Sequence, residues 1–296
     1  MPSLNTSLLS EVVVPHPADL EEQRAIAHIL GTLDDKIELN RRQNETLEAM
    51  ARALFKAWFV DFEPVRAKMD GRWQRGQSLP GLPAHLYDLF PDRLVESELG
   101  LIPEGWEITT LSNYSELNPE SWNKRTMPEK IQYIDLSGVK WGRIENVVTY
   151  EGKTAPSRAR RILKPLDTIV GTVRPGNGSY TLVAEEGLTG STGFAVLRPL
   201  KQEYSEIVYL ASTSDQNIKS LADLADGAAY PAVRPAAVLG TAVPKVSDEV
   251  SSEFSDFTAP LFSAVAENER KSIDLALLRD TLLPRLISGK LRVADA

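Results

Sequence analysis

The chain of 296 residues contains no cysteine and only three histidines, His16, His28 and His85. Without cysteine, disulfide bonds, thiolate zinc sites and cysteine nucleophiles are excluded. The three histidines lack the spacing typical of metal ligands. No apolar run approaches the ~18 residues that a membrane-spanning helix needs, and residues 1–6 do not resemble a signal peptide. We therefore expect a soluble, cytoplasmic protein.

Basic residues are in the minority, with 33 Lys and Arg against 41 Asp and Glu and a formal net charge of −8. This balance predicts no general affinity for nucleic acid or membranes. Residues 124–174, however, contain eleven basic and five acidic side chains, and residues 157–161 are the densest basic cluster among them. Such a region is either an ordinary solvated face or a surface that contacts DNA phosphates, because Arg and Lys supply the salt-dependent part of DNA affinity.

The segment from Asp19 to about Phe62 has a heptad pattern. Eight of ten positions spaced alternately by four and three are apolar: Ile26, Leu30, Leu33, Ile37, Asn40, Asn44, Leu47, Ala51, Leu54 and Trp58. This pattern predicts a helix of some forty residues, roughly 60 Å long, whose apolar stripe needs a partner helix. Asn40 and Asn44 are either exposed at the middle of this helix or buried amides that fix register and partner.

The segment from Phe257 to Leu283 repeats the pattern near the end of the chain. Its positions are Leu261, Ala264, Asn268, Lys271, Leu275, Leu278 and Leu282. Each lies 231 residues after its counterpart in the first segment, which indicates a weak internal repeat. We expect Pro284 and then Gly289 to end this helix. Because one compact domain joins the two segments, we predict that they pair as an antiparallel coiled coil.

The region between the two helices has two parts that differ in composition. Prolines interrupt residues 63–104 and predict a linker. From residue 105 to about 250, short β-like runs separated by Gly and Pro predict one globular α+β domain with mixed or antiparallel strands. Strands are expected at residues 131–134, 146–150, 168–173 and 194–197, and a helix near residues 203–213. The predicted fold class is therefore α+β, with two long helices added to the globular domain.

A glycine-rich turn from Arg174 to Tyr180 carries groups that can read bases. Arginine can bind guanine and asparagine can bind adenine, although a plain hairpin turn explains the glycines equally well. Residues 227–231 resemble a second such turn. The candidate DNA contacts are Lys124, Arg125, Arg158, Arg160 and Arg161 for phosphates, and Arg174, Asn177, Tyr180 and Tyr230 near bases.

Catalytic motifs are weak. Asp135, Glu151 and Lys153 superficially match the acidic pair and lysine of a Mg²⁺-dependent PD-(D/E)xK-type nuclease, but Glu-x-Lys triplets are common by chance. The sequence has no Gly-x-Gly-x-x-Gly or Walker motif and no Gly-x-Ser-x-Gly. We therefore predict a binding protein without catalytic or metal-ligating residues. A Mg²⁺-dependent nuclease and a non-catalytic coiled-coil adaptor are the alternatives.

Three stretches of the first helix, Glu21–Ala27, Leu33–Ile37 and Leu54–Phe62, together resemble the central conserved helix of type I restriction-modification specificity (S) subunits. The resemblance covers essentially the whole chain. Further matching stretches are Leu89–Pro91 with Gly105–Trp106 before the globular domain, Asp167–Val170 with Val173–Pro175 within it, and Leu282–Gly289 in the distal conserved region.

In this family each target-recognition domain reads half of a split DNA site, and two conserved helices pair as an antiparallel spacer that docks two methyltransferase (M) subunits. The chain departs from that plan because Leu8 to Pro15 resembles the end of a first recognition domain whose body is missing. The resemblance thus implies a half-size S protein. Its expected parts are a remnant tail at 1–17, conserved helix 1 at 18–62, a linker at 63–104, a target-recognition domain at 105–250, and conserved helix 2 with a C-terminal tail at 251–296.

The resemblance implies a DNA sequence-specificity and scaffold subunit that is not itself an enzyme. No cofactor is expected on this chain, because S-adenosylmethionine, ATP and Mg²⁺ would belong to partner subunits. The expected partners are double-stranded DNA, M subunits, restriction (R) subunits through the complex and, to supply a second reader, a second copy of the chain. The expected coiled-coil and partner contacts are Leu30, Leu33, Ile37, Asn40, Asn44, Leu47, Leu54, Trp58, Leu261, Asn268, Leu275, Leu278 and Leu282.

Overall fold

A computed structural model of the chain describes residues 16–97, 100–225 and 231–293. The chain divides into two compact units, one formed by residues 1–48 and 262–296 and the other by residues 49–261. Two helices of forty residues each, α2 (Leu20–Phe59) and α7 (Asp248–Ile287), contribute to both units. The heptad pattern therefore predicted the two long helices correctly, because helical periodicity is a local property of the sequence.

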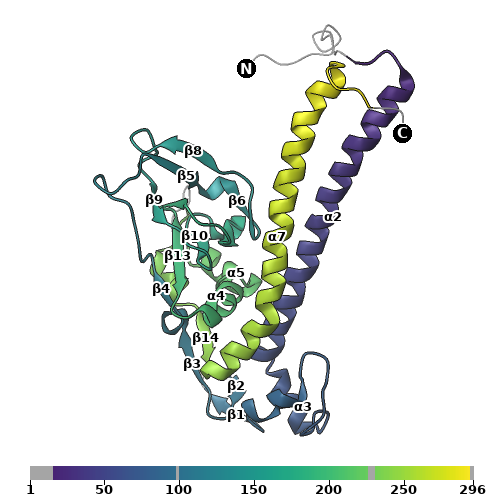
Figure 1. The fold of residues 1–296 in the computed structure, drawn as a ribbon. Helices are drawn as coiled ribbons and strands as arrows, with labels where there is room; N and C mark the ends of the chain where they lie inside the picture. Colours follow the sequence, from purple (N-terminus) through teal and green to yellow (C-terminus); the bar gives the residue numbers. More distant parts are fainter. Residues whose placement is uncertain (1–15, 98–99, 226–230, 294–296) are drawn as a thin grey trace. The chain divides into compact units, whose positions relative to one another are not determined.

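In the first unit, α2 and α7 lie side by side and run in opposite directions (Figure 1). Asp34 of α2 forms a 2.7 Å ion pair with Arg279 of α7. Further along α2, the Nδ2 of Asn40 donates a 3.1 Å hydrogen bond to the Oγ of Ser272, which comes earlier in α7. Residues later in α2 thus contact residues earlier in α7, as expected for antiparallel helices.

Asparagine side chains form hydrogen bonds between the two helices. Asn40 and Asn44 are only 1% and 7% exposed. The Nδ2 of Asn268 donates to the Oδ1 of Asn44 at 2.9 Å, and the Nδ2 of Asn44 donates to the backbone oxygen of Val265 at 3.3 Å. Of the two interpretations of Asn40 and Asn44, the structure therefore agrees with buried amides whose hydrogen bonds define one register.

Both helices have bounds that differ from the predicted ones. α2 ends at Phe59 rather than near Phe62, because Phe62 adopts a left-handed φ of 54° before a short helix begins. α7 begins at Asp248 and is not ended by Pro284, since it continues to Ile287. A proline so near the end of a helix removes a single backbone hydrogen bond, and the next three residues keep helical geometry.

The second unit contains an aromatic cluster around Trp58. Trp58 is 1% exposed, and its ring centroid lies 5.1 Å from Phe90, 5.7 Å from Phe254 and 5.9 Å from Phe257. Trp58, one of the expected helix contacts, therefore packs against α7 of the same chain. The linker residue Phe90, distant in sequence, helps to bury it.

The linker region forms short elements. They are α3 (Glu63–Met69), the 3₁₀ helix η1 (Ala84–Leu89) and the antiparallel strands β1 (Leu94–Ser97) and β2 (Gly100–Pro103). Pro64 lies in the first turn of α3, where a proline costs no helical hydrogen bond.

Two four-stranded sheets form the globular part of the second unit. The first, in the order β11-β10-β13-β4, is antiparallel throughout, and the second, in the order β8-β5-β12-β9, pairs β5 with β12 in parallel. The first sheet consists of β4 (Ser115–Leu117), β10 (Thr168–Gly171), β11 (Tyr180–Leu182) and β13 (Phe194–Pro199). The second consists of β5 (Lys130–Ile134), β8 (Val148–Glu151), β9 (Ala159–Ile162) and β12 (Leu188–Ser191). The four predicted strands are β5, β8, β10 and β13.

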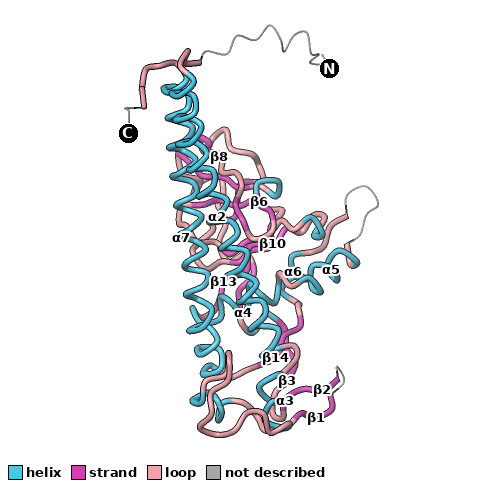
Figure 2. Tube along the Cα trace, turned by 90° about the vertical axis from the view of Figure 1, so that its right-hand side faces the viewer, coloured by secondary structure: helices cyan, strands magenta, loops and turns pink. Residues whose placement is uncertain are grey.

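Smaller elements complete this unit. They are β3 (Glu107–Thr110), η2 (Leu111–Asn113), η3 (Leu136–Gly138), β6 (Val139–Lys140), β7 (Arg143–Ile144), η4 (Pro175–Asn177), η5 (Gln202–Tyr204), α4 (Ser205–Ser212), α5 (Asp215–Asp223), α6 (Pro235–Leu239) and β14 (Ala242–Lys245). β3 pairs with β14, and α4 and α6 pack beside the strands (Figure 2). α4 confirms the helix predicted near residues 203–213. The described helices are too polar or too short for any of them to span a bilayer.

A buried core lies within the second unit. It consists of Ile134, Val139, Leu163, Ile169, Val183, Leu188, Phe194 and Val196. These apolar side chains come from β5, β6, β10, β12 and β13 and from loops beside them, so both sheets contribute to one core. The globular part is thus α+β with mixed and antiparallel strands, as the sequence predicted.

A carboxyl group is buried at the start of α4. Glu206 is 2% exposed, and its Oε2 accepts a 3.1 Å hydrogen bond from the Oγ of Ser255. Burial is the largest influence on this group and raises its pKa. A raised pKa in the folded state means that this carboxyl contributes its full stability when protonated and loses it as the pH rises.

We expect Glu206→Gln to raise the free energy of unfolding at pH 8, because burial penalises the charged carboxylate of Glu206 but not a neutral amide. Glutamine stays neutral and can still accept the hydrogen bond of Ser255. The difference in the free energy of unfolding should vanish near pH 4, where the parental carboxyl is protonated. Urea unfolding at both pH values measures it, with the exposed Glu186→Gln as control. A variant that gains nothing at pH 8 would contradict the argument.

Candidate nucleic-acid interface

Two basic segments that are distant in sequence lie side by side. Residues 121–126 follow β4, and residues 157–161 include the first three residues of β9. Ser121 and Arg161 form an isolated antiparallel bridge, and the backbone N–H of Trp122 donates to the oxygen of Arg160 at 2.8 Å. This pairing brings the two segments together and joins the predicted phosphate contacts Lys124 and Arg125 to the predicted contacts Arg158, Arg160 and Arg161. We call residues 121–126 and 157–161 the paired basic segments.

Arg161 is the most constrained cation of the paired basic segments. Its side chain is half-buried, and its Nη1 donates to the Oγ of Ser121 at 3.2 Å. Its Nε is buried and has no hydrogen-bond partner among the described residues. Burial lowers the pKa of this guanidinium. Since Nε has no exposed surface, only the exposed part of this guanidinium can reach an external acceptor such as a phosphate oxygen.

The glycine-rich turn is built around two left-handed residues. Arg174 has a φ of 47° and Gly178 a φ of 69°, at either end of η4. The backbone N–H of Arg174 donates to the oxygen of Pro231 at 2.8 Å, which fixes the start of the turn. The side chains of Arg174 and Asn177 are exposed, as contacts with bases require.

Tyr180 does not fit the prediction that it lies near bases. It is buried in β11, with its ring 5.9 Å from that of Trp141 and 6.4 Å from that of Tyr209. The guanidinium of Arg52 lies 5.9 Å from the centre of the same ring. Strand geometry turns this side chain inward, so Tyr180 packs beneath the turn instead of reading DNA. Tyr230 lies outside the described residues.

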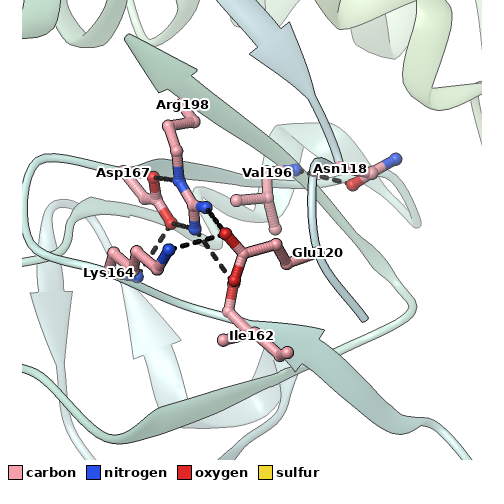
Figure 3. A network of polar contacts seen from close by, with 7 residues as sticks. All are labelled: Asn118, Glu120, Ile162, Lys164, Asp167, Val196 and Arg198. Carbon is pink, nitrogen blue, oxygen red and sulfur yellow. Dashed lines mark hydrogen bonds and ion pairs between the residues drawn. The ribbon is translucent and has the colours of Figure 1, made fainter. Parts of the chain in front are cut away.

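A polar network next to the paired basic segments fixes their position (Figure 3). Arg198 of β13 forms two 2.8 Å hydrogen bonds with Asp167, from Nε to Oδ1 and from Nη2 to Oδ2. Its Nη1 also donates to Glu120 at 2.6 Å, and its Nη2 donates to the backbone oxygen of Ile162 at 3.4 Å. Glu120 immediately precedes the first basic segment, and Ile162 immediately follows the second.

The charges in this network are unequally buried. Asp167 has no exposed surface, whereas Lys164 and Glu120 form a 2.6 Å ion pair that is half exposed. The hydrogen bond from Lys164 is the largest influence that lowers the pKa of Glu120. The hydrogen bond to Asp167 is the largest influence that raises the pKa of Arg198. Arg198 and Asp167 are therefore an ion pair that holds the sheet together, and they are not available to bind DNA.

The residues of the nuclease alternative do not converge. Asp135 follows the end of β5, where its Oδ1 caps η3 by accepting from the backbone N–H groups of Ser137 and Gly138 at 3.0 Å each. Glu151 pairs with Lys130 at the start of β5. Five residues of strand separate the two ends, or about 16 Å. Nowhere in the described ranges do three or more acidic or histidine side chains gather so that they could hold a metal ion.

Residues 1–49 match the family model described as the type I restriction modification DNA specificity domain. The chain is 24% identical over 99% of its length to the type I restriction enzyme MjaIX specificity subunit of Methanocaldococcus jannaschii. It is 26% identical over 92% of its length to the HindI specificity subunit of Haemophilus influenzae. The chain is a relative of type I restriction specificity subunits.

The chain is shorter than these specificity subunits, since it spans 64% and 68% of their respective lengths. Its fold resembles that of a solved type I restriction-modification S subunit from M. genitalium, with a TM-score of 0.51 and 17% identity. That similarity covers 99% of this chain and 66% of the solved chain. The α+β fold with a long C-terminal helix is thus the fold of an S subunit.

The predicted helix contacts of this S-subunit relative differ in burial. Asn40, Asn44 and Trp58 are buried, whereas Leu278 is 47% exposed. The remaining predicted positions are half-buried: Leu30, Leu33, Ile37, Leu47, Leu54, Leu261, Asn268, Leu275 and Leu282. An exposed leucine on a heptad position shows that α2 alone does not cover this part of α7.

The motifs in the sequence did not point to Trp141 as a candidate site residue. Trp141 forms the turn between β6 and β7, and its backbone N–H donates to the oxygen of Gly178 at 2.7 Å. The signal in the sequence was a Trp-Gly pair between Val139–Lys140 and Arg143–Ile144, which is a possible two-residue hairpin turn.

We expect Arg198→Ala to lower the free energy of unfolding by about 3–5 kcal/mol, because it leaves the carboxylate of Asp167 buried without its cation. Lys164→Ala is the matched control from the same network. Its ion pair with Glu120 is solvent-exposed, so its removal should cost less than about 1 kcal/mol. Denaturant unfolding distinguishes the two, and equal losses would show that burial does not set the importance of these pairs.

Proposed function

We propose that the chain is a DNA sequence-specificity and scaffold subunit of a type I restriction-modification complex. The observation that carries the proposal is the pairing of residues 121–126 with residues 157–161, which gathers basic side chains on an otherwise acidic chain. The similarity to type I specificity subunits supports the same function. In this proposal residues 105–250 form the target-recognition domain, and residues 18–62 and 251–296 carry the conserved helices.

Phosphate binding is assigned to the paired basic segments. The side chains of Lys124, Arg125 and Arg158 are exposed, and that of Arg161 is half-buried. Each cation that neutralises a phosphate releases counterions and adds to the salt dependence of binding. These contacts position the duplex but carry no sequence information.

Base reading is assigned to the turn from Arg174 to Gly178. Its two exposed polar side chains, Arg174 and Asn177, can form paired hydrogen bonds with guanine and adenine, respectively. The backbone bond from Arg174 to Pro231 restrains the turn before DNA arrives. A restrained turn loses less conformational entropy on binding and can therefore discriminate more sharply.

Scaffolding is assigned to α2 and α7 as an antiparallel coiled coil that spaces readers and docks methyltransferase subunits. Buried asparagines between the helices support a fixed register. Exposed large apolar side chains on the helices are available for partners: Leu39, Ile273, Leu277 and Leu278. A second copy of the chain would add a second reader, and a two-fold axis would favour an inverted-repeat site.

Catalysis is assigned to other subunits of this complex, in the cytoplasm. Methyl transfer from S-adenosylmethionine would occur on methyltransferase subunits, and ATP- and Mg²⁺-dependent cleavage on restriction subunits. The separation of Asp135 from Glu151 by the length of β5 argues against a nuclease site between them. A plasmid-nicking assay with the purified chain and Mg²⁺ would contradict the assignment if the chain cut DNA.

The proposed function predicts that the full chain, mixed with a type I methyltransferase subunit of its host, enriches one motif from random-sequence duplexes. An inverted repeat in that motif indicates two copies of the chain per complex, whereas an undivided or asymmetric motif indicates one reader acting alone. Sequencing the bound pool measures both features. A pool without an enriched motif would leave the coiled-coil adaptor as the better description.

We expect Arg160→Ala to weaken binding to all duplexes alike and to lower the slope of log affinity against log salt by roughly one. The reason is that a phosphate contact adds one released counterion and no sequence information. Lys245→Ala, which removes a basic side chain paired with Glu107 outside the paired basic segments, is the control. Binding titrations at several salt concentrations measure the slope for each variant. An unchanged slope in Arg160→Ala would refute the phosphate contact.

A further inference from the structure

The turn between β6 and β7 places a tryptophan in an unfavourable backbone conformation. Trp141 and Gly142 are its two central residues, with φ values of 46° and 85°. Positive φ at both central positions is typical of a type I′ hairpin turn, in which Asn-Gly is the favoured pair. A bulky side chain at a positive φ is strained, so the surrounding structure must hold Trp141 in place.

Hydrogen bonds attach this turn to the loop that ends at Tyr180. The backbone N–H of Trp141 donates to the oxygen of Gly178 at 2.7 Å, and that of Gly142 donates to the oxygen of Tyr180 at 2.9 Å. The Oγ1 of Thr181 donates to the oxygen of Gly142 at 2.7 Å. These bonds keep the turn strained and join it to the loop that carries the proposed base-reading residues.

One face of the Trp141 ring rests on Gly178. A Cβ atom at position 178 would lie 2.5 Å from the ring, so only glycine allows this approach. Much of the rest of the side chain is exposed to solvent, since Trp141 is 54% exposed overall. If its role were only to cover Gly178 and Tyr180, a favoured turn residue with a smaller side chain would avoid both the strain and the exposed apolar surface.

The surroundings of Trp141 are basic and polar. Lys140 and Arg143 flank the turn, and the Nζ of Lys140 donates to the backbone oxygen of Asn177 at 3.3 Å. Asn177 and Arg174 follow on the adjoining loop, both exposed. An exposed aromatic ring within such a surface suits DNA, where cations meet phosphates and apolar side chains contact thymine methyl groups or wedge against base steps.

We propose that Trp141 contacts bases directly and is a specificity-determining residue of this chain. The proposal rests on the proposed function and extends it from the hydrogen-bonding loop to an apolar contact on the neighbouring hairpin. Arg174 and Asn177 supply the polar contacts, and Trp141 supplies an apolar contact that rejects base pairs with the wrong shape or without a methyl group.

Trp141→Asn tests this role without removing the turn, because Asn-Gly is the favoured pair for this geometry. The full chain is used, with the duplex that the parental chain selects from a random pool and a scrambled duplex of the same composition. We expect affinity for the selected duplex to fall about ten- to a hundredfold, as for the loss of one good base contact. Affinity for the scrambled duplex and the salt slope should stay unchanged, since no phosphate contact is lost.

Two controls separate this role from a structural one. The thermal unfolding midpoint of Trp141→Asn should equal or exceed that of the parental chain, because the strain is relieved. Leu200→Asn, which removes a side chain that is 58% exposed in the turn after β13, should bind both duplexes as the parental chain does.

Each outcome is decisive. Equal affinity of Trp141→Asn and the parental chain for the selected duplex would overturn the role of Trp141 alone. A lower unfolding midpoint together with equal losses on both duplexes would show that Trp141 only supports the fold. A parental chain that selects no motif would overturn the proposed function and, with it, this inference.

Discussion

The buried carboxylate of Asp167 constrains the architecture of the candidate interface. A carboxylate with no exposed surface must be paired, and the guanidinium of Arg198 pairs with both of its oxygens. The same guanidinium reaches Glu120 and the oxygen of Ile162. One ion pair in the sheet thereby holds the chain on both sides of the paired basic segments.

The pair of long helices also buries polar groups that must find partners, but these groups are the uncharged amides of asparagine side chains. Asn40 and Asn44 bury amides that apolar side chains could replace with a gain in stability, but these amides must find partners, such as Asn268 for Asn44, in one register. The register between α2 and α7 matters if the pair serves as a spacer. A shift of one heptad along α7 would change the length of the paired region by about 10 Å. A protein that measures the distance between DNA sites would benefit from this restriction, at a cost in stability.

The proposed interface divides its work between charge and shape. The paired basic segments offer cations whose attraction for phosphate is independent of sequence. The two loops around Gly178 offer a restrained set of polar and apolar groups, fixed by backbone hydrogen bonds from Trp141 and Arg174. Because the two sets of residues lie on different segments of the chain, residues of the reading loops can change while the phosphate contacts remain.

Local patterns in the sequence determined the long helices, the four predicted strands and α4, because periodicity and turn residues act within a few neighbours. They also located the basic region and the residues that resemble an S subunit. They did not indicate that α7 begins at Asp248 and continues through Pro284, that Phe90 helps to bury Trp58, or that Tyr180 points inward. Only the tertiary structure brought Ser121 to Arg161 and Trp141 to Gly178. These contacts join residues about forty positions apart, and their energies depend on burial and geometry that exist only once both sheets have formed.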